Sequence, residues 1–425
     1  MALGACRQSP REPVTLRFTY GWSSYPNELS KVAALSQRFT RETGILLKSI
    51  PTPENTLDTL DLWHRLLPKG SSGTDVLRLD WVWSPVLAPE LIDLRSHFAA
   101  ELSMLVEPEL LPGYTVGDKL VAIPYRVSVG VLEYRTDLLR EYSYDHPPKT
   151  WDELESMAVK IQAGERAKGK KDFWGYVWQG TAEALTCNAL EWQAAEGGGR
   201  IIEKDRTISV NNPAAIRAWQ RAKSWIGRIS PLGVLAYRER DTMAIFDSGK
   251  AAFNRVWLFT TSTLGGQGRQ PYWRLSPPKV KAGYTRMPGG PAGSGGTLGG
   301  SGLAISRHTP HQKEAIELVR FLIRAQIESN GKYDADNLSE PPEAVDLPPI
   351  LARYDSERSK QRDSHLIMRP SGAAGTAYEQ VTKACIAAVH AVLAGQTPAP
   401  QAAAELERKL VETTSFRIGP PKTAD

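Results

Sequence analysis

The residue types that carry out catalysis in known enzyme motifs occur in this sequence, but not at the required spacings. There is no G-x-S-x-G turn, no H-E-x-x-H helix, no G-x-x-x-x-G-K-[ST] loop and no G-x-G-x-x-G following a strand. Ser248-Gly249-Lys250 lacks the upstream glycine of a phosphate-binding loop. His308 and His311 have no third metal ligand nearby, so a solvated helix start is favoured. The sequence therefore predicts no enzyme, no metal site and no cofactor.

The composition is that of an ordinary soluble globular protein. The chain has 425 residues, of which 41% are hydrophobic and 23% charged. A membrane-spanning helix needs about 18 uncharged, apolar residues in a row, and no stretch of this sequence approaches that length. The net charge of +5 is spread along the chain among acidic residues, which argues against nucleic-acid binding. The chain has twelve Trp and only nine Phe, which is an unusual ratio. Indole rings suit flat amphipathic ligands as well as hydrophobic cores.

The first part of the chain predicts an α/β unit with a parallel sheet. Hydrophobic spacing predicts strands over 16–22, 45–50 and 76–81, and helices over 27–43 and 54–67. Ligands of such sheets bind beyond the carboxyl ends of the strands. We therefore expect Ser23, Ser24 and the residues from Asp80 to Trp83 to lie near a ligand.

A second α/β series follows an extended region at 120–135, where we expect two extended runs broken by Pro124 and Gly130. Beyond it the pattern predicts three strands, over 173–178, 251–257 and 303–306, the last one preceded by a glycine-rich segment at 289–302. Helices are expected over 150–168, 182–195, from 213, after 310, and over about 374–394 and 398–413. Two α/β lobes with an extended segment between them predict a cleft that is closed by a hinge.

The three cysteines fit neither a disulfide-rich scaffold nor a zinc site. Cys6 ends the segment Leu3-Gly4-Ala5-Cys6, which resembles the lipobox of bacterial lipoproteins, where the cysteine carries lipid. The charged and apolar segments that precede a lipobox are missing, so we expect a trimmed sequence or a start placed too late. The alternative is a chance LGAC in a cytoplasmic protein. Cys187 and Cys385 would remain, and they could form a disulfide.

Five segments, in the right order, resemble the extracellular solute-binding proteins of ABC sugar importers, particularly the maltose- and trehalose-binding type. They are VAIPY at 121–125 with GVLEYRTDLL at 130–139, PPKTWDEL at 147–154, FDSGKAAFNRVW at 246–257, TLGGSGLAIS at 297–306, and the ending with RP at 369–370, Tyr378 and HAVLAG at 390–395.

This resemblance implies a two-lobed α/β fold of the periplasmic-binding-protein type. It implies hinge crossings near 124–130, 299–306 and 366–372, so that each lobe is discontinuous in sequence. We expect an N-terminal lobe of 14–124 plus 303–366 and a C-terminal lobe of 125–302 plus 367–415, flanked by a tether at 1–13 and a tail at 416–425. The resemblance also implies an extracytoplasmic monomer, anchored at most by lipid, that delivers a disaccharide or oligosaccharide to a membrane permease.

The resemblance places ligand-binding residues at several positions. Asp80 would accept hydrogen bonds from sugar hydroxyls, and Trp257 would stack on the apolar face of a sugar ring. Helix capping by Asp80 and core burial of Trp257 are the structural alternatives. Further candidates of the same kind are Trp83, Arg126, Glu183, Arg255, Tyr378, Ser23 and Ser24.

The chain departs from the family pattern at three positions. Ser301 stands where the family usually has Trp, Ser128 where an acidic residue is common, and Arg126 at an aromatic-type position. A stacking plane and a hydroxyl acceptor are thereby lost. A sugar acid or a phosphorylated polyol or sugar is therefore an alternative ligand, and a carbohydrate-cleaving enzyme is the alternative from a different functional class.

Overall fold

A computed structural model describes residues 13–19, 26–53, 55–103, 110–259, 280–330 and 364–422. The strands are β1 (Thr15–Thr19), β2 (Leu46–Ile50), β3 (Val76–Asp80), β4 (Thr115–Val116), β5 (Lys119–Leu120), β6 (Ile123–Arg135), β7 (Trp174–Val177), β8 (Ala251–Phe259), β9 (Ala282–Thr285), β10 (Ser294–Ile305) and β11 (Ser364–Ile367). The longer helices are α1 (Pro26–Thr43), α2 (Thr56–Leu66), α6 (Thr136–Glu141), α7 (Trp151–Ala167), α8 (Ala182–Ala195), α9 (Pro213–Trp225), α10 (Glu239–Asp247), α11 (Gln312–Asn330), α14 (Tyr378–Leu393) and α15 (Ala399–Thr414).

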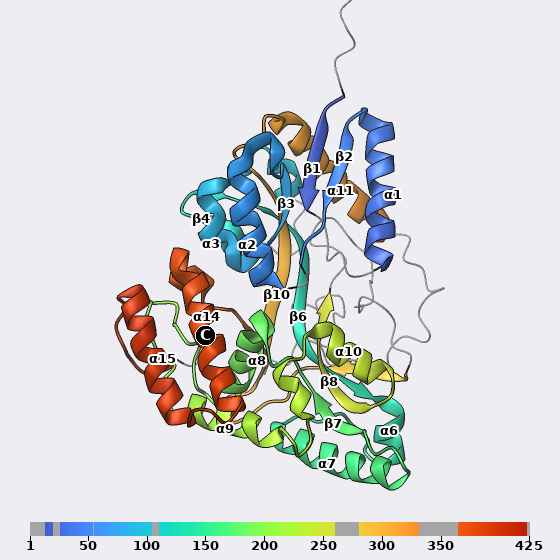
Figure 1. Ribbon diagram of the computed structural model, residues 1–425, viewed down its shortest axis with the longest axis vertical. Helices are drawn as coiled ribbons and strands as arrows, with labels where there is room; N and C mark the ends of the chain where they lie inside the picture. The colour runs from blue at the N-terminus through green and yellow to red at the C-terminus, as the bar shows by residue number, and fades with distance from the viewer. Residues whose placement is uncertain are drawn as a thin grey trace, which may run out of the picture.

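The fold is mixed α/β and has two lobes, as predicted (Figure 1). The upper lobe contains β1, β2 and β3 with α1, α2 and α11, and the lower lobe contains β7 and β8 with α6 to α10, α14 and α15. One sheet runs through both lobes in the order β2-β1-β3-β10-β6-β8-β7, with β11 beside β10 and β9 beside β6. The pairings β2-β1-β3 and β7-β8 are parallel, as βαβ units require.

Two long antiparallel strands, β6 and β10, connect the lobes. The end of β10 pairs with β3 in the upper lobe, while the second half of β6 pairs with β8 in the lower lobe. Between these regions the two strands pair with each other, and their register shifts between Ser301 and Gly302. Such a bulge bends the sheet locally. The bend therefore lies where the chain passes from one lobe to the other.

The glycine-rich segment was expected to lead into a short strand, but it forms most of β10 itself, from Ser294 onward. Glycine is used here because neighbouring backbone is too close for a side chain. A Cβ at Gly296 would clash with the carbonyl of Gly130, and one at Gly300, whose φ is 141°, would clash with the carbonyl of Arg126. Likewise β6 runs unbroken through Pro124 and Gly130, which corrects the expectation of two separate runs.

The helix starts follow from side-chain capping. The Thr150 hydroxyl accepts a hydrogen bond from the amide of Glu153 at the start of α7, and Asn212 caps α9 in the same way. Helix α8 is different, because nearly all of its side chains are buried between the sheet and α9 and α14. A helix of this kind lacks a polar face, so its polar residues must find partners inside the protein.

The high tryptophan content is explained largely by the core. Eight indole rings are buried, namely Trp63, Trp81, Trp83, Trp151, Trp178, Trp192, Trp219 and Trp225. In the lower lobe, Trp151 stacks on Trp225 with ring centres 5.2 Å apart, and Trp178 meets Trp192 edge to face at 5.0 Å. Most of these rings are therefore structural.

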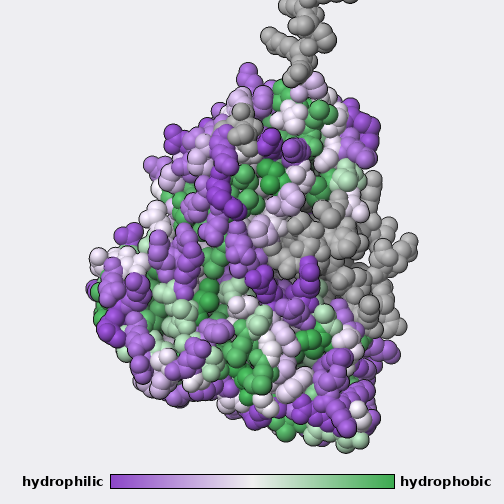
Figure 2. Space-filling view, in the orientation of Figure 1, coloured by the Kyte–Doolittle hydropathy of each residue, from purple (hydrophilic) through white to green (hydrophobic). Residues whose placement is uncertain are grey.

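The surface is predominantly polar on the face shown in Figure 2, with hydrophobic side chains scattered among hydrophilic ones. The large exposed apolar side chains among the described residues, Leu46, Val159, Leu232 and Ile418, come from separate elements. In the described ranges, no helix is both long enough and apolar enough to cross a membrane.

Candidate functional site

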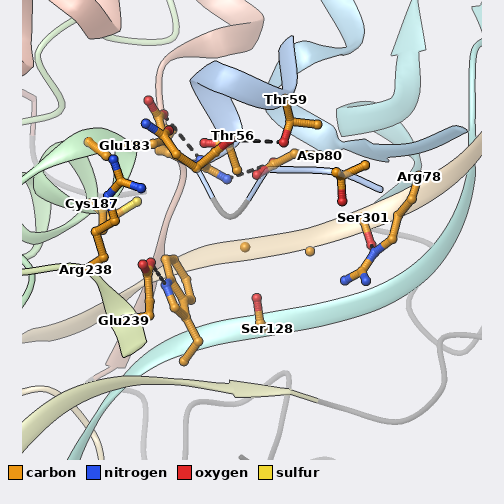
Figure 3. Close-up of a pocket in the computed structure, with 18 of the residues that line it drawn as sticks. Thr56, Thr59, Arg78, Asp80, Ser128, Glu183, Cys187, Arg238, Glu239 and Ser301 are labelled. Carbon is orange, nitrogen blue, oxygen red and sulfur yellow. Dashed lines mark hydrogen bonds and ion pairs between the residues drawn. The ribbon is translucent and has the colours of Figure 1, made fainter. Parts of the chain in front are cut away.

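A cavity of about 110 Å³ lies where the two lobes face each other (Figure 3). The upper lobe contributes the start of α2 and the end of β3, and the lower lobe contributes the starts of α8 and α10 and the strand β8. The connecting strands form the floor. The lining residues are Thr52, Asn55, Thr56, Thr59, Trp63, Arg78, Asp80, Ser128, Ala182, Glu183, Ala184, Cys187, Arg238, Glu239, Trp257, Gly299, Gly300, Ser301 and Arg369.

Asp80 lines this cavity at the carboxyl end of β3. Its Oδ1 accepts a hydrogen bond from the amide of Val82 at 3.3 Å and thereby caps the turn of residues 81–83. The same oxygen accepts a hydrogen bond from Nη2 of Arg369 at 3.0 Å. Asp80 therefore caps the turn and also presents a paired carboxylate to the cavity.

Glu183 also lines the cavity, in the first turn of α8. Tyr378 and Thr382 donate hydroxyl hydrogen bonds to its two oxygens at 2.6 and 2.7 Å, and Arg369 donates from 3.3 Å. Burial raises the pKa of this carboxyl, although the Arg369 charge and the two hydroxyl groups oppose the shift. The preceding residue, Ala182, has φ of 56°, a strained conformation for alanine that lies at the cavity wall.

Arg369 connects these two carboxylates, and its side chain is only 3% exposed. Burial alone would lower its pKa, but the charges around it, that of Asp80 first, raise the pKa well above its ordinary value. Its Nε has no hydrogen-bond partner within the described parts of the chain. The sequence drew attention to Arg369 only as part of the family-like ending, so its place in the site was missed.

Trp257 also lines the cavity and is partly exposed, consistent with a wall position at the end of β8. Its indole N–H donates to Oε1 of Glu239 at 3.2 Å, the interaction drawn below Glu239 in Figure 3. Glu239 begins α10 and was not foreseen as a site residue. No sequence motif around Glu239 indicated a ligand-binding role.

Four predicted site residues are not at the cavity wall. Arg255 is fully buried under Trp257, where Glu191 binds its guanidinium. Tyr378 and Trp83 are fully buried with ring centres 5.4 Å apart, although the Tyr378 hydroxyl reaches Glu183. Arg126 lies on β6 opposite Ser301, with its guanidinium 5.9 Å from the centre of the Tyr125 ring.

The remaining expectations concern serines and cysteines. Ser23, Ser24 and Cys6 lie outside the described residues. Cys187 and Cys385 are free, buried thiols rather than a disulfide, and Cys187 lines the cavity. Burial raises the pKa of both thiols to about 12.

The cavity also contains polar residues that the sequence did not single out as ligands. Arg78 donates from Nε to the hydroxyl of Ser301 at 2.7 Å, and Arg238 is the N-cap residue that precedes α10. Ser301 and Ser128, two of the departures from the family pattern, both line the cavity. Three guanidinium groups and three carboxylates thus face the same space, and their formal charges cancel. Within the described residues, no group of three or more His, Cys, Asp or Glu side chains is arranged to hold a metal ion.

The known proteins that this chain resembles include binding proteins of several organisms. The chain is 35% identical over 381 residues to a probable ABC transporter-binding protein of Deinococcus radiodurans, covering 88% of this chain and 87% of that protein. It is 27% identical over 167 residues, 38% of this chain and 36% of the relative, to an sn-glycerol-3-phosphate-binding periplasmic protein of Brucella abortus. A solved structure, maltose-bound T. maritima MalE3, has a TM-score of 0.75 at 28% identity, covering 93% of this chain and 99% of that one.

The family described as bacterial extracellular solute-binding protein matches residues 30–328. This match spans more than half of the chain and includes the strands and helices that form most of the cavity wall. Together with the Deinococcus relative, it shows that the chain belongs to the bacterial extracellular solute-binding protein family.

Proposed function

We propose that this protein captures a neutral carbohydrate or polyol in the interlobe cavity and delivers it to the permease of an ABC transporter. The observation that carries this proposal is the cavity itself, in which Asp80, Glu183 and Trp257 come together from both lobes. A carboxylate accepts hydrogen bonds from neighbouring hydroxyl groups, and an indole matches the apolar face of a sugar ring. The maltose bound to the T. maritima structure supports the same ligand class.

The charge balance of the cavity favours a neutral ligand over an anionic one. Arg369 is already neutralised by Asp80 and Glu183, and Arg78 donates to Ser301. An anion would have to compete with the two carboxylates for Arg369. The second candidate, a sugar acid or phosphorylated polyol, is favoured by the exposed Arg238 at the cavity and by the Brucella relative that binds sn-glycerol-3-phosphate.

The proposal includes how the protein is organised and where it works. Residues 14–124 with 303–366 would form one lobe, and 125–302 with 367–415 the other, closing on the ligand about β6 and β10. Cys6 would carry a lipid anchor that holds a monomer outside the cytoplasmic membrane. The protein would release its ligand chemically unchanged, because its family consists of solute-binding proteins.

Titration calorimetry and thermal melting with a defined panel test the proposal. Maltose, mannitol and ribitol represent neutral ligands, and gluconate and sn-glycerol-3-phosphate represent anions. A true ligand at about a hundred times its dissociation constant should stabilise the protein by about 2.7 kcal/mol. Recovery of that ligand intact after long incubation is expected. Cleavage of the sugar would instead favour the enzyme, and preference for the anions would favour the second candidate.

A further inference from the structure

We propose that Arg255, held by Glu191, is a positioning residue that fixes the indole ring of Trp257 at the wall of the cavity. This inference rests on the proposed function, because Trp257 is there a ligand contact. Arg255 itself is 0% exposed and absent from the cavity lining, so it acts through the ring rather than on the ligand.

The geometry places the guanidinium directly against the indole. Cζ of Arg255 lies 3.9 Å from the centre of the Trp257 ring. The two residues are two positions apart on β8, so their side chains project from the same face of the strand. A desolvated cation on the face of an indole is attracted by the negative potential of the ring.

Glu191 fixes the orientation of the Arg255 guanidinium through two hydrogen bonds. Nε and Nη2 of Arg255 donate to the two oxygens of Glu191 at 3.2 and 2.7 Å, and both side chains are 0% exposed. The amide of Thr297 in β10 donates to Oε1 of Glu191 at 3.0 Å. The carboxylate therefore ties α8, β8 and β10 together behind the ring.

Two further features concern the packing of the Arg255–Glu191 ion pair beneath Trp257. A Cβ at Gly130, which pairs with Trp257 across the β6–β8 ladder, would clash with Oε1 of Glu191 and Nη2 of Arg255. Nη1 of Arg255 has no hydrogen-bond partner among the described residues. The indole face is the remaining attraction that offsets its burial.

The ring is thus held at two points that differ in chemistry. Arg255 holds its face, and Glu239 accepts a hydrogen bond from its N–H. The attraction of Glu191 outweighs burial and raises the pKa of the Arg255 guanidinium, so the cation persists at neutral pH. A ligand that packs on Trp257 would meet a ring already set in one orientation.

A double-mutant cycle with maltose as the probe tests this role. Arg255→Lys keeps the charge but loses the planar fork that both binds Glu191 and stacks on the ring. It should weaken maltose binding roughly three- to tenfold, while Trp257→Ala alone weakens it more. The double variant should be no weaker than Trp257→Ala, because Arg255 acts through Trp257. Additive losses, or unchanged affinity in Arg255→Lys, would overturn the proposal.

The matched control is Arg221→Lys, which alters an arginine that is also bound by carboxylates, Glu155 and Glu196, but that does not line the cavity. Its maltose affinity should equal that of the wild type. If Arg255→Lys fails to fold, Glu191→Gln takes its place in the same cycle.

A ligand-free measurement separates this inference from the proposed function. The near-ultraviolet circular dichroism of Arg255→Lys should differ from that of the wild type, and the difference should vanish in a Trp257→Phe background. Persistence of the difference in that background would overturn the positioning role. A wild type that binds no member of the ligand panel would instead overturn the proposed function.

Discussion

Nη2 of Arg369 lies 3.0 Å from Oδ1 of Asp80, and this ion pair joins residues that are 289 positions apart in the chain. Arg369 follows β11, whereas Asp80 ends β3 in the upper lobe. Through Glu183 the same guanidinium also reaches the start of α8 in the lower lobe. One buried cation therefore links acidic groups of both lobes at the cavity.

Arg369→Met should lower the free energy of unfolding by about 3–5 kcal/mol, because it leaves the buried Glu183 and the half-buried Asp80 without their shared cation. Urea unfolding measures the loss. Arg38→Met is the control, since Arg38 also pairs with two carboxylates, Glu42 and Glu328, but is 37% exposed and should cost little. Equal effects of the two substitutions would contradict the role of burial.

The stability of the wild type should depend on the titration of Glu183. Its raised pKa means that the native state binds this proton more tightly than the unfolded chain does. Between the ordinary value of 4.5 and the raised native pKa, stability should therefore fall as pH rises, relative to a Glu183→Gln variant. Unfolding of both proteins across acidic to neutral pH measures the difference, and parallel curves would refute it.

Gly130→Ala should destabilise the protein by about 1–3 kcal/mol, because the added methyl group overpacks the buried Glu191–Arg255 pair. Gly372→Ala is the matched control, since a Cβ there meets nothing within 4 Å. Melting curves of the two variants report the contrast. A neutral Gly130→Ala would mean that the pair can shift freely.

Asp80→Ala should weaken binding of the preferred neutral ligand roughly ten- to a hundredfold, through loss of a charge-assisted hydrogen bond. It should also lower the free energy of unfolding by more than the about 1 kcal/mol of a lost cap, because it leaves the buried Arg369 without its Asp80 partner as well. Asp93→Ala serves as the control, since Asp93 caps backbone amides outside the cavity. Calorimetric titration separates the effects, and equal affinities of the two variants would exclude Asp80 as a ligand contact.

Cys187 and Cys385 should resist alkylation in the native protein at pH 8. Both thiols are buried, and their pKa values of about 12 leave very little thiolate at that pH. Mass spectrometry should find both peptides unmodified after treatment with iodoacetamide, and modified after denaturation without reductant. A crosslinked peptide pair in the non-reduced protein would contradict the free-thiol state.

The sequence predicted elements whose signals are local. The expected helix over 182–195 has those bounds as α8, and Thr150 and Asn212 cap the helices they were expected to begin. The glycine-rich strand β10 could not be foreseen, because glycine is unfavourable in strands unless neighbouring backbone requires it.

The site was predicted only in part, because some of its residues are placed by contacts between segments that are distant in the sequence. Asp80 ends β3 and Trp257 lies near the end of β8, so topology alone places them near the cavity. Arg369 needs partners from β3 and α8, and Arg255 is drawn inward by Glu191, so both depend on contacts between distant segments. The spacing of residues along the sequence does not reveal that the side chains of Arg255 and Arg369 are buried.

The shared sheet limits how the molecule can be divided into fragments. A protease or a designed truncation that separated the lobes would have to sever β6 and β10, which pair with each other and extend the sheet to β8 in the lower lobe and to β3 in the upper lobe. Either half would then expose long, unpaired strand edges that invite aggregation. Neither lobe is therefore expected to be obtained as a well-behaved independent domain, and folding of the two should be a single cooperative event.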